Sequence, residues 1–543
     1  MPIIRFRPLF IPCHSPGHGA GAPTQPRGQA ALTRSVILHT GHRSRRLRSR
    51  PVFFPRWRCL RPTRLLIATL TLSVLILGLP STQVSPSHGT VRADTQFYVH
   101  LPSASRAWTG VFPPMGISWY DWTPDDVAVV PEQARLAGAR WILAKPVLWS
   151  VVQPSEPAPG MPPSYNWGPY DAALAAPAAS GLTPIGLVSV NPEWARDPSF
   201  ADRASGPIAA EHVDDFVAFV KAAIAHYSAS PYNVKHWIIY GEPDCSNPAL
   251  CNYYGHWGDV PERYAALLAQ LYPAVKADYP GVTIIMGNLA MDWFSDRTEN
   301  PGPFERHFLE NVLVAGGGQY VDAFAFNYFP EHASEWAPYG PDILGKVNYI
   351  RSIIAAKYPN GANKKLLCTE IAALGSDSLL DEQARYITKL YARTHAGGLD
   401  AVLYLGTKEW YLDTEKREGP RGLLNEFGQP KPAYIAYQYY ASTMASTTYL
   451  GPVSDADLGL APGTGAVEGY RFRRMVDGNE TWVLWANQSR SDAVVHASSV
   501  TLTSKVGQSL PTVDLGGGAF RIAFGSDYGQ VPVGDPVYLE LSR

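Results

Sequence analysis

Eight short apolar runs recur along the chain, each followed by a loop and then by an amphipathic stretch of helical length. They lie at 112–119, 139–147, 183–190, 234–240, 282–287, 321–329, 364–372 and 399–406. Strands that are apolar throughout are buried on both faces, which is typical of a parallel sheet covered by helices. Eight such units over about 330 residues match a (β/α)₈ TIM barrel in number and size. A doubly wound sheet is the alternative architecture.

The composition and the pattern of apolar residues change after the eighth run. A helix between Pro430 and Tyr440 is expected to close the barrel, which we place at 94–440. From about Ala441 onward the chain is rich in Gly, Thr and Ser and carries short alternating segments. This pattern predicts a small antiparallel β-sandwich domain at 441–543.

The first 93 residues differ sharply in charge from the rest. They carry 14 Arg and no Lys, Asp or Glu, which leaves 32 basic against 47 acidic residues, a formal charge of −15, for the remainder. An acidic body argues against nucleic acid as a partner. The first 50 or so residues have the low complexity of a basic arm rather than the periodicity of a fold.

An uncharged apolar segment runs from Leu65 to Leu79 and follows several arginines. Its 15 residues suit the apolar core of a signal peptide better than a membrane span of about 20. We therefore expect a secreted or extracytoplasmic protein. An uncleaved signal anchor is the alternative, and it is the only route by which a membrane would be a partner.

Three cysteines lie beyond this arm. Cys245 and Cys251 are close together in a Pro/Asn-rich loop and could form one small disulfide. Cys368 lies inside an apolar run, so we interpret it as a buried thiol.

Two glutamates stand at corresponding places in the pattern. Glu242 follows the fourth apolar run after a single glycine, and Glu370 comes near the end of the seventh. In a barrel of parallel strands the chemistry lies at the C-terminal ends of the strands, so both carboxyl groups are expected to face one cavity. A paired Lys or Arg inside the barrel would be the purely structural explanation for either residue.

Two carboxyl groups in one cavity can divide acid and nucleophile roles when their surroundings separate their pKa values. A separation of about 5–5.5 Å suits a retaining glycosidase, and about 6.5–9.5 Å an inverting one. Spacing along the sequence does not decide between them.

The segments around these residues resemble glycoside hydrolase clan A, and their sequence pattern is most similar to families 5 and 39. The likeness runs through 165–195, with its Pro-Glu-Trp-Ala, through 272–287 and through 422–437. It implies a retaining enzyme that cleaves a β-linked oligo- or polysaccharide, with Glu242 as acid/base and Glu370 as nucleophile. It also implies that the last domain is the small β-sandwich that often follows such barrels.

The chain departs from the clan at three places. Gly241 stands where the clan has the Asn that holds the sugar 2-hydroxyl, and Leu143 or Ala144 stands where it has an Arg. Asn327 replaces the usual His, so the donor that braces the nucleophile is either Tyr328 or a residue elsewhere. We expect Lys145 or Asn191 to reach the sugar's 2-position instead.

Further residues are candidates for contact with substrate. Aromatic rings stack on the apolar faces of sugars, but most aromatic residues simply fill a core. The complete set of candidate substrate-binding residues is Lys145, Trp149, Asn191, Trp194, Asn327, Tyr328 and Trp410.

Neither a metal site nor a cofactor is indicated. No strand end gathers His with Asp or Glu, and no Gly-rich phosphate loop follows a strand. The expected partner is a carbohydrate substrate. Two other functions stay open: a non-catalytic carbohydrate-binding protein on a glycosidase scaffold, motivated by Gly241 and the missing Arg, and a transglycosylase that uses the same intermediate.

Overall fold

The computed structural model describes residues 114–118, 126–251, 255–409, 420–487, 491–525 and 531–542. The basic arm at 1–93 and the candidate Trp410 lie outside these residues. Within the described ranges, no helix is both long enough and apolar enough to span a lipid bilayer.

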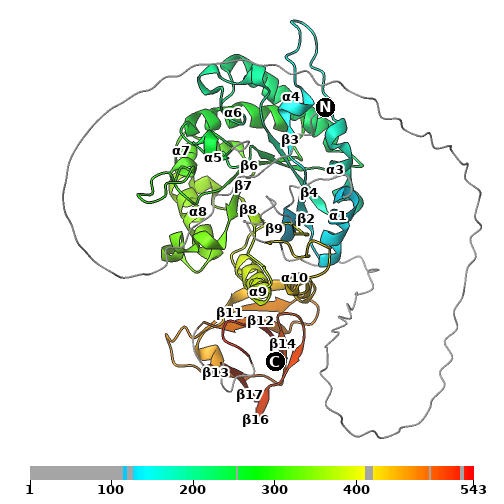
Figure 1. Ribbon diagram of the computed structural model, residues 1–543. Helices are drawn as coiled ribbons and strands as arrows, with labels where there is room; N and C mark the ends of the chain where they lie inside the picture. Colours follow the sequence, from blue (N-terminus) through cyan, green and yellow to red (C-terminus); the bar gives the residue numbers. More distant parts are fainter. Residues whose placement is uncertain are drawn as a thin grey trace, which may run out of the picture. The chain divides into compact units, whose positions relative to one another are not determined.

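A closed barrel of parallel strands forms the first part of the described chain (Figure 1). All eight apolar runs supply strands, and the second run supplies two short ones, β2 and β3, which both pair with β4. The ring closes where β1 pairs with β9 on one side and with β2 on the other. The strands are β1 (Met115–Ser118), β2 (Trp141–Leu143), β3 (Val147–Leu148), β4 (Thr183–Ser189), β5 (His236–Ile239), β6 (Thr283–Leu289), β7 (Ala323–Tyr328), β8 (Lys365–Ile371) and β9 (Ala401–Leu405).

Helices surround the ring of strands, as Figure 1 shows. The amphipathic stretches predicted from the sequence form α4 and α6, and the closing helix expected after Pro430 is α10. The α-helices of the described barrel are α1 (Asp126–Ala137), α2 (Trp149–Val152), α3 (Gly168–Ala179), α4 (Val213–Tyr227), α5 (Pro248–Cys251), α6 (Pro261–Asp278), α7 (Phe308–Val314), α8 (Ile343–Lys357), α9 (Leu380–Ala396) and α10 (Pro432–Thr443). The predicted TIM barrel is therefore confirmed.

Two apolar layers explain why the strands are apolar on both faces. Every residue of β1 and β9 is buried, as are all but the first residue of β4, β6 and β8. Alternate strand residues pack against the helices in one layer and fill the barrel interior in the other. The interior layer consists of Leu143, Ile185, Leu187, Ile238, Ile285, Ala323, Ala325, Leu367, Ala401 and Leu403.

Antiparallel sheets make up the C-terminal part, as predicted. One sheet has the order β10-β11-β12-β18-β14-β15 and the other β13-β17-β16, around an apolar core of their own. The strands are β10 (Thr447–Pro452), β11 (Val467–Arg474), β12 (Glu480–Ala486), β13 (Ser491–His496), β14 (Ser499–Ser504), β15 (Ser509–Leu510), β16 (Val513–Gly516), β17 (Ala519–Phe524) and β18 (Val537–Ser542).

Ion pairs join the sandwich to the barrel. Arg393 of α9 donates two hydrogen bonds to Glu468 of β11, at 2.8 and 2.9 Å. Lys505 reaches Asp535 within the sandwich and Asp381 of α9. The two parts therefore share a polar contact along α9.

The cysteine interpretations are also confirmed. Cys245 and Cys251 form a disulfide that closes the loop after β5. Cys368 is a buried free thiol, and burial raises its pKa.

Candidate active site

Glu242 lies in a tight turn directly after β5. Tyr240 and Glu242 both have left-handed backbone angles, with φ of 62° and 43°, which is uncommon for residues other than glycine. The Glu242 amide donates to the carbonyl of Asn288, and the Gly255 amide donates to the carbonyl of Gly241. A Cβ at Gly255 would lie 1.7 Å from the Glu242 carbonyl oxygen, so only glycine fits behind this turn. From this strained turn the Glu242 carboxyl group reaches the side chain of Asn327 on β7.

Glu370 lies on β8, one residue before the strand ends. Only 7% of its surface is exposed. The side chain of Asn288, on β6, donates from Nδ2 to Glu370 Oε1 at 3.0 Å. One donor that braces this glutamate is therefore Asn288, a residue that the sequence did not single out.

Two asparagines connect the glutamates. Asn327 Nδ2 donates to Glu242 Oε1 at 2.9 Å. Its own Oδ1 accepts from Asn288 Nδ2 at 3.1 Å and from the Thr369 hydroxyl at 3.0 Å. A continuous chain of hydrogen bonds therefore runs from Glu242 through Asn327 and Asn288 to Glu370, and the structure brings the two predicted glutamates together.

The electrostatic environment of Glu242 favours its protonated form. Burial raises the pKa of this carboxyl well above its ordinary value, and the nearby charges of Glu370, Asp244 and Asp292 raise the pKa further. The hydrogen bond from Asn327 acts in the opposite direction, because it stabilises the carboxylate. A carboxyl group whose pKa is raised in this way can keep its proton near neutral pH and act as a general acid.

Lys145 and Asn191 have protein partners. The Lys145 ammonium lies 3.4 Å from the Pro169 carbonyl and over the Tyr170 ring. The buried Asn191 side chain donates to the Gly206 carbonyl and accepts from the Tyr240 hydroxyl at 2.6 Å. Contact of either residue with a sugar stays a prediction, and in this structure Asn191 supports the residue that begins the Glu242 turn.

The tryptophan candidates pack against protein. Trp149 is fully buried, stacks on Phe219 and donates to Gln153 at 2.8 Å. Trp194 is partly buried and meets the edge of Trp149. Core packing, the alternative interpretation of Trp149, is the arrangement observed.

Tyr328 follows Asn327 on β7, so its side chain points to the other face of the strand. It is fully buried, and its hydroxyl donates to Asp342 at 2.5 Å. It therefore does not supply the hydrogen bond to Glu370 Oε1 that Asn288 makes.

The functional residues that sequence reasoning missed lie at strand ends and behind them. Asn288 comes one residue after the fifth apolar run, a polar residue at a strand end like the two glutamates. Asp244 is buried and accepts hydrogen bonds from the amides of Ala290 and Met291, and burial raises its pKa to about 7. A search for any polar residue just past an apolar run would have found Asn288.

No group of three or more His, Cys, Asp or Glu side chains that could hold a metal ion occurs among the residues that the structure describes.

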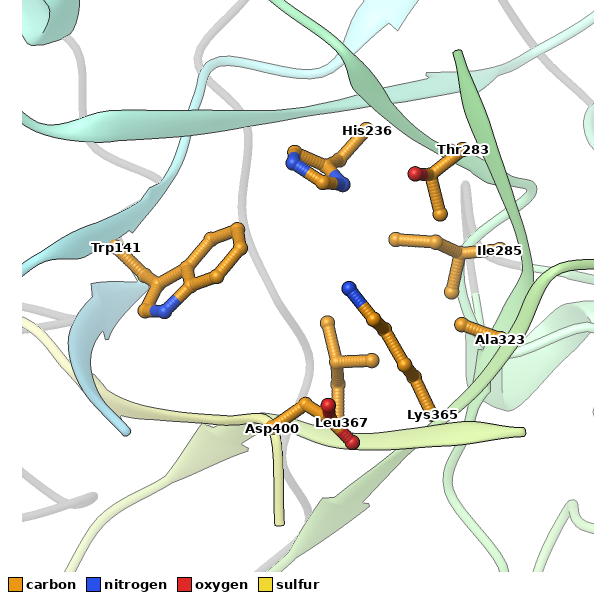
Figure 2. Close-up of a pocket in the computed structure, with 8 residues that line it drawn as sticks. All are labelled: Trp141, His236, Thr283, Ile285, Ala323, Lys365, Leu367 and Asp400. Carbon is orange, nitrogen blue, oxygen red and sulfur yellow. The ribbon is translucent and has the colours of Figure 1, made fainter. Parts of the chain in front are cut away.

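A small hollow occupies the opposite end of the barrel (Figure 2). Trp141, His236, Thr283, Ala323 and Lys365 are the first residues of their strands, whereas Glu370 lies near the end of its own. In Figure 2 the Lys365 side chain extends into the hollow from β8. The full lining is Trp141, His236, Thr283, Ile285, Ala323, Lys365, Leu367 and Asp400.

Fold and site together define a (β/α)₈ protein with paired glutamates at the C-terminal ends of its fourth and seventh barrel strands. No protein-family model matches the chain, and no curated protein sequence does. Its likeness to other proteins is therefore found among solved structures.

A family 39 glycoside hydrolase from Bacteroides cellulosilyticus superposes with a TM-score of 0.59 and 19% identity, over 79% of this chain and 81% of that one. For a family 30 endoxylanase from Clostridium papyrosolvens the TM-score is 0.52 at 12% identity, over 80% and 97% of the two chains. A glucosidase from Croceicoccus marinus superposes with a TM-score of 0.52 and 14% identity, over 80% of this chain and 96% of that one. At such identities the likeness is one of fold, and it agrees with the resemblance to family 39 noted in the sequence.

Proposed function

We propose that the protein is a retaining glycoside hydrolase that cleaves a β-linked glycosidic bond in an oligo- or polysaccharide. The observation that carries the proposal is the hydrogen-bonded chain from Glu242 through Asn327 and Asn288 to Glu370. It places two carboxyl groups in one site, and the pKa of one of them is raised. The fold shared with family 39 and family 30 glycoside hydrolases supports the same conclusion.

The reaction has two displacement steps. In the first, the Glu370 carboxylate attacks the anomeric carbon while the Glu242 carboxyl gives its proton to the departing oxygen. In the second, the Glu242 carboxylate takes a proton from water, and that water attacks the anomeric carbon and releases Glu370. The raised pKa of Glu242 suits the first step, and loss of its proton prepares it for the second.

The two glutamate roles can be separated with azide as an added nucleophile. In Glu242→Ala, azide should replace water in the second step and give a glycosyl azide with the configuration of the substrate. In Glu370→Ala, azide should attack the substrate directly and give the inverted azide. Aryl β-xylosides, aryl β-glucosides and xylan form the starting panel, because the similar structures include an endoxylanase and a glucosidase. Full activity in both variants without azide would contradict the proposal.

A carbohydrate-binding protein without turnover is the second candidate, and the absence of the clan's Asn at Gly241 favours it. Calorimetry with xylan oligosaccharides on the wild-type chain separates the two: binding without any product after long incubation supports the binding protein. A transglycosylase would instead form longer oligosaccharides from the same substrates.

We also propose export, on the basis of the apolar segment from Leu65 to Leu79 within the Arg-rich arm. Expression of the full chain, followed by N-terminal sequencing of the protein in the medium, tests cleavage after that segment. A full-length protein that stays with the membrane fraction would support the signal anchor.

A further inference from the structure

A fully buried lysine lies behind the two asparagines. Lys346 belongs to α8 and has no exposed surface. Its ammonium donates to the carbonyl of Asn327 at 2.7 Å and to the carbonyl of Ala290 at 2.5 Å. The Ala290 amide is held in turn by Asp244, two residues after Glu242. The lysine therefore links the ends of β6 and β7, and these strands carry Asn288 and Asn327.

A buried ammonium is costly unless it is paired, because burial favours the neutral form. Burial indeed lowers the pKa of Lys346, and Asp292, Asp244, Cys368 and Glu242 oppose this decrease. The Asp292 carboxylate lies 3.8 Å from the ammonium, and both side chains are almost completely buried. Replacement of a buried ion pair by hydrophobic residues is often neutral or stabilising, so stability alone does not account for the charge of Lys346.

We propose that Lys346 is a positioning residue for the glutamate pair: it fixes the strand ends that carry Asn288 and Asn327 and balances the negative charge behind Glu242. The inference rests on the proposed function, because it assigns Lys346 a part in the same site. Its hydrogen bonds to the carbonyls of Ala290 and Asn327 hold the strand ends that carry the asparagine side chains, and its charge offsets the charges of Asp244 and Asp292. The other charged groups facing Glu242 are Glu370 and Lys346 itself.

The test compares two variants that differ only at Lys346. Asp292→Asn keeps the lysine, and the double variant Asp292→Asn with Lys346→Met removes both charges, which avoids leaving an unpaired charge in the core. We expect the double variant to have a kcat at least about tenfold below that of Asp292→Asn, with KM within about twofold, since about 1.4 kcal/mol of lost positioning is a factor of ten. Loss of the cation should also move the alkaline limb of kcat/KM upward by about one pH unit.

Lys505→Met serves as the matched control, because it also removes a buried lysine that pairs with a carboxylate, here Asp535 of the sandwich. It should lower the melting temperature without changing kcat or the pH profile. Equal kcat and equal alkaline limbs in Asp292→Asn and the double variant would contradict the positioning role.

The two proposals can fail separately. An inactive wild-type chain contradicts the proposed function alone, because the pH titration of the Glu242 carboxyl can be followed without substrate by ¹³C NMR in the same variants, with Glu242→Gln to assign the signal. If the pH midpoint of the Glu242 titration is the same with and without Lys346, the charge-balancing role is overturned, whether or not the wild-type chain is active.

Discussion

The two ends of the barrel are built from the same strands but differ in what they contain. At the C-terminal ends, Val190, Tyr240, Glu242 and Met291 have left-handed backbone angles, and the buried carboxyl groups of Asp244 and Asp292 join the glutamate pair. The middle of the barrel interior is filled by aliphatic side chains, and the other end holds the small hollow of Figure 2. Backbone strain and buried charge each cost free energy, so their concentration at one end indicates a site maintained for function, and the apolar layer indicates the part that stabilises the fold.

Removal of the nucleophile is the largest expected effect. Glu370→Gln should lower kcat by roughly 10⁴-fold or more, as loss of a covalent catalytic group typically does. The melting temperature should stay the same or rise, because one of two neighbouring acidic groups becomes neutral. Steady-state kinetics and calorimetry on one preparation check both. If Glu370→Gln lost stability in proportion to its activity, the C-terminal ends of the strands could not be distinguished from the stabilising interior.

The interior layer should show the opposite behaviour. Ile238 has no exposed surface, and Ile238→Ala should reduce the free energy of unfolding by about 2–5 kcal/mol. Activity per folded molecule should stay close to wild type at low temperature. Urea unfolding followed by Trp fluorescence, with active-site titration, measures the two quantities. A large loss of kcat in fully folded Ile238→Ala would contradict the division between a stabilising interior and a catalytic end.

Asn327→Ala should have an intermediate effect at the glutamate end. The hydrogen bond from Asn327 lowers the pKa of Glu242, so its removal should raise that pKa and shift the alkaline limb of kcat/KM to higher pH. We expect a decrease in kcat/KM equivalent to about 1–3 kcal/mol. Asn348→Ala, on the exposed side of α8, is a suitable control. A shift of the alkaline limb to lower pH would contradict the conclusion that the Asn327 hydrogen bond lowers the pKa of Glu242.

The smallest effect is expected at the hollow of Figure 2. Burial, with a smaller contribution from Lys365, lowers the pKa of His236 to about 4, so the folded protein holds this ring neutral. The unfolded chain binds the proton first, and stability present above about pH 6.5 should be lost as the pH falls toward 4. His236→Gln should reduce the acid loss by about 1 kcal/mol or less at pH 6. Melting temperatures of the wild type and of His236→Gln from pH 8 to pH 4.5 measure this difference. Parallel curves of melting temperature against pH would contradict the role of His236.

Much of the fold could be predicted because its signal is local. Each barrel strand is an apolar run that can be recognised within a few residues, and the glutamates stand out because a charge at the end of such a run is unusual. The split of the second run into β2 and β3 could not be predicted, because Lys145 and Pro146 between them do not by themselves indicate where pairing stops.

The rest of the site depends on contacts between distant residues. Asn288 and Glu370 are 82 positions apart, and Lys346 belongs to a helix whose other buried residues give no sign of a charge partner. Trp149 illustrates the same limit: the sequence left both sugar contact and core packing open for this ring, and the structure packs it against Phe219. Composition and spacing do not distinguish a ring in a core from a ring at a surface.

The double-displacement reaction requires a covalent glycosyl intermediate on Glu370, and this intermediate can be trapped. An activated 2-deoxy-2-fluoro β-glycoside of the best substrate slows both steps, and the first can still proceed because the leaving group needs little help from Glu242. Intact mass spectrometry should show one added glycosyl group, and peptide mapping should locate it on Glu370, with no adduct in Glu370→Gln. An adduct on another residue, or turnover of the natural substrate to a product of inverted configuration, would contradict the account.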